Sequence, residues 1–128
     1  MASSSPNIPW DEGAIRSCLE RMWADPRYGR AWLARVDGEA IGYGILGFGF
    51  SLEYDGVDAF VDELYLRPAW RGRGIGTAIL NVMESACREA GVTALHLEVD
   101  HVNADGQRLY RRHGFVDHDR HLMTKRLG

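Results

Sequence analysis

Hydrophobic and polar positions follow two periods along this chain, and the first is that of a helix. Between Asp11 and Ala24, apolar residues recur at the spacing of one helix face, at Ile15, Cys18, Leu19 and Met22. Asp11 is a suitable N-cap, and Pro26 stops the pattern. The pattern therefore predicts a helix over Asp11–Ala24, and all four residues of this stripe are expected to face a core.

Three segments with strand-like alternation come next. The first is Arg30–Asp37, and the dipeptide Asp37-Gly38 after it is typical of a tight hairpin turn. The second is the aromatic, glycine-rich segment Glu39–Glu53, and Asp55-Gly56 marks another turn. The third, Val57–Leu66, is apolar on both faces, which is typical of a central strand covered on both sides.

The second half of the chain alternates helices and strands. A strong helix follows Arg71–Gly76, with an apolar stripe at Ile75, Ile79, Leu80, Met83 and Cys87 and with Gly91 at its end. The remaining elements are a strand over Thr93–Asp100, a helix capped by Asn103 that runs to His113, and a last strand over Leu122–Leu127. This order predicts an α/β (α+β) three-layer fold, in which helices cover both faces of a mixed, mostly antiparallel sheet.

Length and composition are those of one globular domain. The chain has 128 residues, of which 45% are hydrophobic and 26% charged. We therefore expect a single domain over residues 1–128, with the Ser-rich segment 1–9 as a flexible tail. The two cysteines, Cys18 and Cys87, are interpreted as small buried hydrophobic residues of a reducing compartment.

Charge and hydropathy exclude two classes of partner. The net charge is −3, and acidic residues are interspersed among the basic ones, which argues against nucleic acid as a partner. No apolar run approaches the roughly 20 residues of a membrane span. The N-terminus has neither a basic start nor an apolar signal region, so we expect a cytoplasmic protein that binds no membrane.

The loop Arg71–Thr77 is the strongest candidate for a binding site. Its glycines stand between a predicted strand and a predicted helix, where backbone N–H groups and the helix dipole favour an anion such as a pyrophosphate. The plainer interpretation is a glycine-rich turn with two solvated arginines. Lys125 is the only lysine, so a phosphate-binding loop of the ATPase type is excluded.

A competing signal lies at Gly42–Gly47, which matches the dinucleotide-binding pattern G-x-G-x-x-G. That pattern requires a helix directly after the loop. Here Phe48, Phe50 and Leu52 follow at strand spacing, so no helix is available for a pyrophosphate. Glycines inside a strand more often mark a bulge or a close approach.

Taken together, these motifs resemble the GNAT N-acetyltransferase superfamily, and the resemblance runs from about Arg30 to Leu127. Its elements are Val61–Pro68, then Arg71, Gly74 and Gly76, then Leu97-Glu98-Val99, then Asn103, and finally Leu109-Tyr110 with Gly114-Phe115. The resemblance implies acetyl-CoA as the cosubstrate and a primary amine of a small molecule or protein as the acceptor, joined by direct attack in a ternary complex. It also implies a further strand before Arg30, where only 29 residues precede, so we expect either that the first strand is absent or that the chain begins late.

The resemblance also implies a role for each matching residue. The main chain of Leu64, Tyr65 and Leu66 would hold the pantetheine arm of acetyl-CoA. The pyrophosphate would bind the loop residues Arg71, Gly72, Arg73, Gly74, Ile75, Gly76 and Thr77. Asn103 would contact the pantetheine side of the cosubstrate, and Tyr110 would lie near the thioester sulfur.

Acetyl transfer to an amine requires a base and profits from an acid. Tyr110 is the candidate acid that protonates the leaving thiolate. Two carboxylates are candidates for the base. Glu98 precedes Tyr110 by twelve residues, a spacing found in some protein N-terminal acetylases of the superfamily, and Glu63 lies on the central strand beside the pantetheine segment. Their plainer interpretations are an outward-facing acid for Glu98 and an arginine partner for Glu63, and the sequence leaves the choice open.

Three further interpretations concern partners. Acids at Glu53, Asp55, Asp58, Asp62 and Glu63 would attract a cationic acceptor or would be solvated loop residues. The histidines at 101, 113, 118 and 121 have no metal-ligand spacing, so we expect no metal. The open sheet edge left by the missing strand favours a homodimer. The alternative function is a non-catalytic acyl-CoA-binding or protein-interaction module of the same fold.

Overall fold

The computed structural model describes residues 10–53, 56–100, 102–118 and 122–128. Its elements in chain order are α1 (Glu12–Ala24), β1 (Gly29–Val36), β2 (Glu39–Ser51), β3 (Gly56–Leu66), the short 3-10 helix η1 (Pro68–Trp70), α2 (Ile75–Glu89), β4 (Ala94–Leu97) and α3 (Ala104–Arg112). The predicted flexible tail, residues 1–9, lies outside the described residues.

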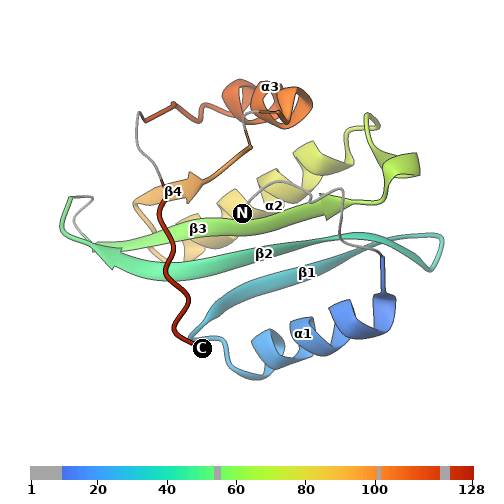
Figure 1. The fold of residues 1–128 in the computed structure, drawn as a ribbon, viewed down its shortest axis with the longest axis horizontal. Helices are drawn as coiled ribbons and strands as arrows, with labels where there is room; N and C mark the ends of the chain where they lie inside the picture. Colours follow the sequence, from blue (N-terminus) through green and yellow to red (C-terminus); the bar gives the residue numbers. More distant parts are fainter. Residues whose placement is uncertain (1–9, 54–55, 101, 119–121) are drawn as a thin grey trace.

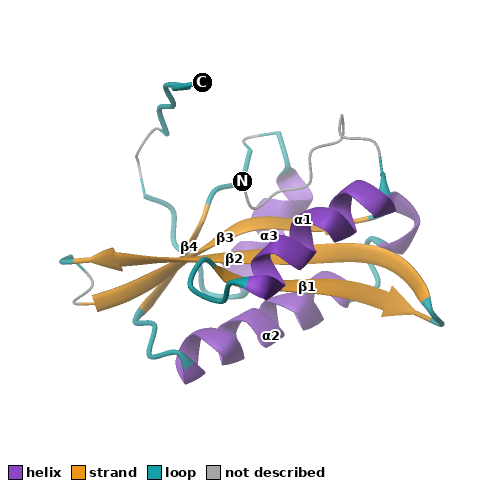
Figure 2. Ribbon diagram, turned by 90° about the horizontal axis from the view of Figure 1, so that it is seen from below, coloured by secondary structure: helices purple, strands orange, loops and turns teal. Residues whose placement is uncertain are grey.

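The sheet has four strands within the described residues, in the order β1-β2-β3-β4 (Figure 1). The first three strands are antiparallel, and β4 runs parallel to β3. Helix α1 covers one face of the sheet and α2 the other (Figure 2). The predicted three-layer arrangement around a mixed, mostly antiparallel sheet is therefore confirmed.

Local chemistry explains where these elements begin and turn. The Asp11 carboxylate accepts a hydrogen bond from the Ala14 backbone N–H at 3.1 Å and caps α1. In the β1–β2 turn, Asp37 has φ of 51° and Gly38 has φ of 81°. Two successive positive φ values give the turn the twist that a two-residue hairpin requires, as the dipeptide predicted.

Two apolar clusters hold the layers together, one on each face of the sheet. On the α2 face, Ile79, Leu80, Met83 and Cys87 of the helix pack on Leu46, Ala59, Val61 and Leu64 of the strands, and Tyr110 of α3 joins them. On the α1 face, Leu19 packs on Ala31, Tyr43 and Ile45. The sheet is therefore buried on both sides at its centre, and α3 belongs to the α2 side.

Strand β1 is the outer strand of the sheet on the side opposite β4. The Tyr28 carbonyl accepts from the Phe48 N–H on β2, so alternation along the strand turns the Ala31 main chain outward. The indole Nε1–H of Trp23 on α1 donates to that Ala31 carbonyl at 2.8 Å. Trp23 therefore covers part of the edge on which the homodimer prediction rests.

Two sequence-based predictions about structure are wrong. Residues 122–128 form no strand, and Leu122, Met123 and Leu127 are exposed. Figure 2 shows the C-terminus standing away from the sheet, where its backbone has no strand to pair with. Cys18 was expected in the core but is exposed, because the buried side of α1 is centred on Leu19.

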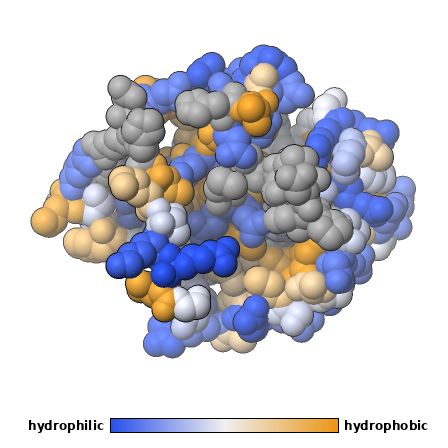
Figure 3. All heavy atoms as spheres, in the orientation of Figure 1, coloured by the Kyte–Doolittle hydropathy of each residue, from blue (hydrophilic) through white to orange (hydrophobic). Residues whose placement is uncertain are grey.

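Apolar side chains also gather at one end of the molecule. Figure 3 shows hydrophobic atoms at the end where β2 turns into β3, and the exposed apolar residues there include Phe50 and Leu52. Among the described residues, no helix is long and apolar enough to cross a membrane.

Candidate functional site

The sheet contains an interruption between β3 and its outer strand β4. These strands pair only from Asp58 to Val61 on β3 and from Ala94 to Leu97 on β4, whereas β3 continues to Leu66. Beyond Val61 the β4-facing edge of β3 has no strand partner among the described residues. An open strand edge exposes main-chain groups that can bind an extended ligand.

A β-bulge decides which main-chain groups reach that open edge. Val61 lies opposite Leu46 and Glu63 lies opposite Ile45, so Asp62 is the extra residue. After the bulge, the Arg67 N–H donates to the Ile41 carbonyl on β2. Because neighbouring residues of a strand direct their main-chain groups to opposite sides, the Leu66 main chain faces away from β2. By the same alternation Leu64 and Leu66 face the gap, whereas Tyr65 is paired with Tyr43 on β2.

Arg71 joins this open edge to the glycine loop. Its Nε–H donates to the Leu66 carbonyl at 2.9 Å, and its guanidinium carbon lies 5.4 Å from the Tyr65 ring centroid. The guanidinium carbon of Arg73 lies over Trp70 of η1, 5.0 Å from the ring centroid. Both arginines thus rest on aromatic rings beside the loop, where their charge contributes a positive potential.

The glycine loop leads directly into the N-terminus of α2. Gly72 and Gly74 have φ values of 75° and 82°. Residues with a side chain are strained in this backbone conformation, whereas glycine adopts it freely. Gly74 is the N-cap residue of α2 and offers no side-chain hydrogen bond. The first-turn N–H groups, which belong to Ile75, Gly76 and Thr77, therefore keep their capacity to bind an anion at the positive end of the helix dipole.

Helix α3 packs against the first turn of α2 and carries two predicted site residues. A Cβ at Gly76 would lie 3.3 Å from Cδ2 of Leu109, so the two helices are in close contact. Asn103 caps α3, with its Oδ1 accepting from the Gly106 N–H at 2.9 Å. Its predicted contact with a cosubstrate would have to use the side-chain amide group or the main chain.

Tyr110 points from α3 into the cluster on the α2 face. It is 4% exposed and meets Phe115 edge-on, with ring centroids 6.0 Å apart. Burial raises the pKa of Tyr110 to about 12. The hydroxyl therefore stays protonated at neutral pH, so a proton is present at this position.

Glu63 lies on the opposite face of the sheet, where its partner is a tyrosine. The Tyr43 hydroxyl donates to Oε1 of Glu63 at 2.9 Å. No arginine or lysine of the described residues forms an ion pair with Glu63, so these residues give the arginine-partner interpretation no support. Glu98 follows the last residue of β4 on the other side of the gap and is half-buried.

The remaining acids of the predicted cluster have different surroundings. Asp58 is buried, and its Oδ2 lies 3.2 Å from Nε2 of His96. The ring centroids of His96 and Phe60 are 4.9 Å apart. Asp62 lies over β2, and the loss of hydration there raises the pKa of its carboxyl. Asp55 lies outside the described residues. Among the residues that the structure describes, no three His, Cys, Asp or Glu side chains gather as metal ligands.

The sequence interpretation missed Tyr43, His96 and Trp10. Tyr43 and His96 gain their partners through strand pairing, and Trp10 does so by stacking on Tyr65. The available signal was the hairpin between β2 and β3, which pairs Tyr43 with Tyr65 once the bulge at Asp62 is known.

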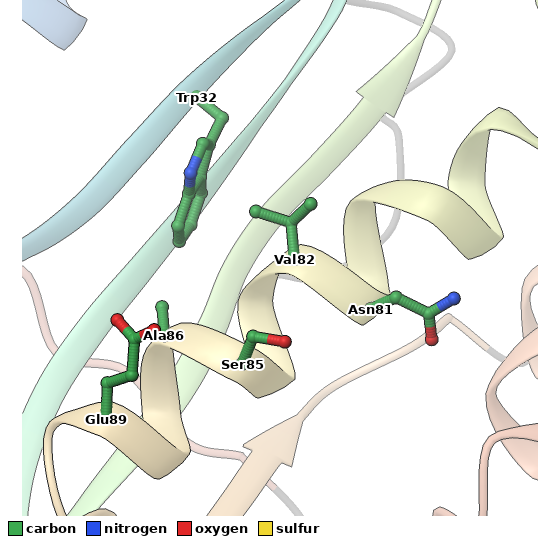
Figure 4. Close-up of a pocket in the computed structure, with 6 residues that line it drawn as sticks. All are labelled: Trp32, Asn81, Val82, Ser85, Ala86 and Glu89. Atoms are coloured by element: carbon green, nitrogen blue, oxygen red, sulfur yellow. The ribbon is translucent and has the colours of Figure 1, made fainter.

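A separate hollow lies away from the gap and the loop. It is formed between Trp32 of β1 and one side of α2, and its lining residues are Trp32, Asn81, Val82, Ser85, Ala86 and Glu89 (Figure 4). The predicted site residues do not line it. The hollow is open and shallow, and it adds nothing to the candidate site.

Comparisons with known proteins agree with this geometry. Residues 2–115 match the family model described as "Acetyltransferase (GNAT) family". An "IAA acetyltransferase" of Azospirillum brasilense is 33% identical over 88 residues, which cover 69% of this chain and 55% of that protein. The chain thus spans about half the length of this relative.

Two solved structures show the likeness in three dimensions. An integron cassette protein from the Cole Harbour Salt Marsh metagenome has a TM-score of 0.76 at 36% identity, covering 91% of this chain and 71% of that one. A predicted acetyltransferase of Clostridium acetobutylicum, solved with acetyl-CoA, has a TM-score of 0.70 at 22% identity over 95% of this chain and 79% of that one. The second likeness concerns the fold alone.

Proposed function

The chain belongs to the acetyltransferase (GNAT) family, and we propose that it transfers the acetyl group of acetyl-CoA to a primary amine by direct attack in a ternary complex. The observation that carries this proposal is the short connection, η1 and the glycine loop, that joins the open β3 edge to the N-terminus of α2, where no side chain caps the helix. Within this connection, Arg71 donates to the Leu66 carbonyl on the open edge. A ligand with an amide-bearing arm and a pyrophosphate fits such a pair of sites.

Acetyl-CoA supplies an activated acyl group when bound, and the chain's residues hold it. The main chain of Leu64 and Leu66 would pair with the pantetheine arm, and the N–H groups of the loop and of the first turn of α2 would bind the pyrophosphate. Arg71 and Arg73 would add positive charge around the phosphates. Tyr65 would act through its ring, as a support for Arg71.

Two residues on opposite faces of the sheet would manage the protons. Deprotonating an alkylammonium near neutral pH costs about 4 kcal/mol, so a nearby carboxylate that accepts this proton lowers the barrier. We assign this role to Glu63, because its carboxylate is oriented by Tyr43 beside the gap. The N–C bond forms as the C–S bond breaks, and Tyr110 gives its proton to the leaving sulfur. The nitrogen then loses its second proton, which restores the Tyr110 hydroxyl and leaves the neutral amide.

The faces also define the two routes into the site. Tyr110 packs with the α2-face cluster, and Glu63 contacts a member of the α1-face cluster. The cosubstrate would therefore approach from the α2 side and the amine from the α1 side, and they would meet at the gap. Holding the two reactants there supplies a further part of the rate acceleration.

Calorimetric titration with acetyl-CoA tests the proposal. We expect micromolar binding that weakens at least tenfold for acetylpantetheine, which lacks the pyrophosphate, because that charge would face the α2 N-terminus. Release of the thiol in the presence of a panel of primary alkylamines, diamines and peptide N-termini then measures turnover. Absence of binding would refute the proposal, whereas binding without turnover on any amine would support the non-catalytic acyl-CoA-binding module.

A further inference from the structure

Tyr43 and Glu63 form a diagonal pair across strands β2 and β3. Tyr43 lies opposite Tyr65, and Glu63 lies opposite Ile45, so the two residues are displaced by two positions along neighbouring strands. Long side chains at such diagonal positions can meet on one face of a sheet. Here the Tyr43 hydroxyl donates to Oε1 of Glu63 at 2.9 Å.

The Tyr43 ring is held in a fixed position by its neighbours. It is 7% exposed, and its centroid lies 5.7 Å from that of Tyr65 and 6.5 Å from that of Trp10. Trp10 is itself stacked on Tyr65 and covered by the guanidinium of Arg67. The hydroxyl is therefore presented in one direction by a rigid aromatic stack, at little cost in side-chain entropy.

The charge of the surroundings fixes which partner donates. Burial, together with the Glu63 carboxylate, raises the pKa of Tyr43 above its ordinary range, so its hydroxyl keeps its proton. The other titratable groups facing Tyr43 are Tyr65 on β3 and Cys18 on α1, and Asp62 adjoins Glu63 along β3. None of these groups is a cation, so the tyrosine donates and the carboxylate accepts.

Glu63 has no second hydrogen-bond partner within the part of the chain that the structure describes. One carboxylate oxygen is thus held by Tyr43, and the other is left for a proton from solvent or substrate. A hydrogen bond to the charged form of a carboxylate favours that form. The same bond limits the directions in which the second oxygen can point.

We propose that Tyr43 is a positioning residue for acetyl transfer, which orients the Glu63 carboxylate so that it can accept the proton of the acceptor amine. This inference rests on the proposed function. It concerns a residue of β2, outside the glycine loop and the strand segment that bind the cosubstrate. A purely structural pair would instead exist because a buried hydroxyl needs an acceptor.

Replacing Tyr43 by phenylalanine separates these two roles. The ring and its stacking remain, and only the donor is lost. We expect kcat at neutral pH to fall about tenfold while KM for the amine changes by less than about twofold, because the carboxylate is no longer held toward the amine. Acetyl-CoA affinity should be unchanged. Tyr28→Phe, which removes a hydroxyl from an exposed ring, is the matched control and should leave kcat unchanged.

An unchanged kcat in Tyr43→Phe would overturn the proposal even if stability fell. Glu63→Gln completes the test, because glutamine keeps an oxygen that can accept from Tyr43. We expect this variant to stay folded and to lose at least 100-fold in kcat. Full activity of Glu63→Gln would overturn both the assignment of Glu63 as the base and the role of Tyr43.

A measurement without turnover keeps this inference separable from the proposed function. Carbon-13 NMR of labelled glutamate carboxyls, with Glu63 assigned through Glu63→Gln, reports on the surroundings of this one group. At neutral pH we expect the Glu63 signal of the wild type to lie apart from those of exposed glutamates and to move toward them in Tyr43→Phe, because the hydrogen bond to Tyr43 is lost. Equal Glu63 signals in the two proteins would refute the Tyr43 proposal even if the protein proves to be an active acetyltransferase. A changed signal in a protein without turnover on any amine would count against the proposed function alone.

Discussion

Tyr110→Phe is expected to lower kcat by about 10²–10⁴-fold while acetyl-CoA affinity stays within about twofold. The phenyl ring fills the same buried space and keeps its edge-on contact with Phe115. What disappears is the hydroxyl that we propose as the proton donor to the leaving sulfur. A thiolate can leave without a proton, so the loss has an upper limit set by general acid catalysis rather than by the whole rate acceleration.

The pH dependence of the wild type adds a second criterion for Tyr110. Because burial raises the pKa of Tyr110 to about 12, the hydroxyl stays protonated through pH 10, and it should cause no loss of kcat below that pH. Thermal unfolding and acetyl-CoA titration of Tyr110→Phe serve as controls for folding and binding, and Tyr28→Phe controls for the loss of a remote hydroxyl. Turnover of Tyr110→Phe equal to that of the wild type would remove Tyr110 from the mechanism.

Local sequence signals predicted the elements that depend on local chemistry. The dipeptide Asp37-Gly38 predicts a turn with two positive φ values, and the structure has them at these positions. The apolar stripe from Ile79 to Cys87 predicts the buried face of α2, and these residues do form the core. In both cases the information lies within a few residues, where helix period and turn geometry act directly.

The last predicted strand shows where such local reasoning fails. Leu122–Leu127 carries a strand-like composition, but a strand is stable only when another strand pairs with its backbone. The described residues of this segment stand apart from the sheet (Figure 2), so no strand of the sheet pairs with their backbone. The strand predicted over Thr93–Asp100 likewise ends at Leu97, where the pairing with Val61 ends.

The residues of the candidate site likewise fall into those that local sequence predicts and those that depend on contacts between distant segments. The loop Arg71–Thr77 was predicted from its own glycines, since their role depends on local backbone geometry. The choice between Glu63 and Glu98 could not be made from sequence, because it depends on a contact with Tyr43 across twenty residues and on the strand register. That register contains the bulge at Asp62, which no residue of the pattern announces.

Gly74→Asp is expected to weaken acetyl-CoA binding at least 100-fold. Gly74 is the N-cap of α2, has φ of 82°, and has open space where a side chain would project. A carboxylate there would lie beside the first-turn N–H groups, where the phosphates are proposed to bind. Two like charges about 4 Å apart near a protein surface repel by several kcal/mol, which exceeds the amount needed for a 100-fold loss.

Gly74→Asn is the matched control, because asparagine has the same shape as aspartate without the charge. Both residues tolerate a left-handed backbone better than other non-glycine residues, so strain should affect the two variants alike. A negative charge at a helix N-terminus is favourable for the helix itself, so weaker binding of Gly74→Asp could not be attributed to unfolding of α2. Calorimetric titration of the two variants compares them directly. Equal acetyl-CoA affinities would place the pyrophosphate elsewhere, whereas a large difference would put its negative charge at the start of α2.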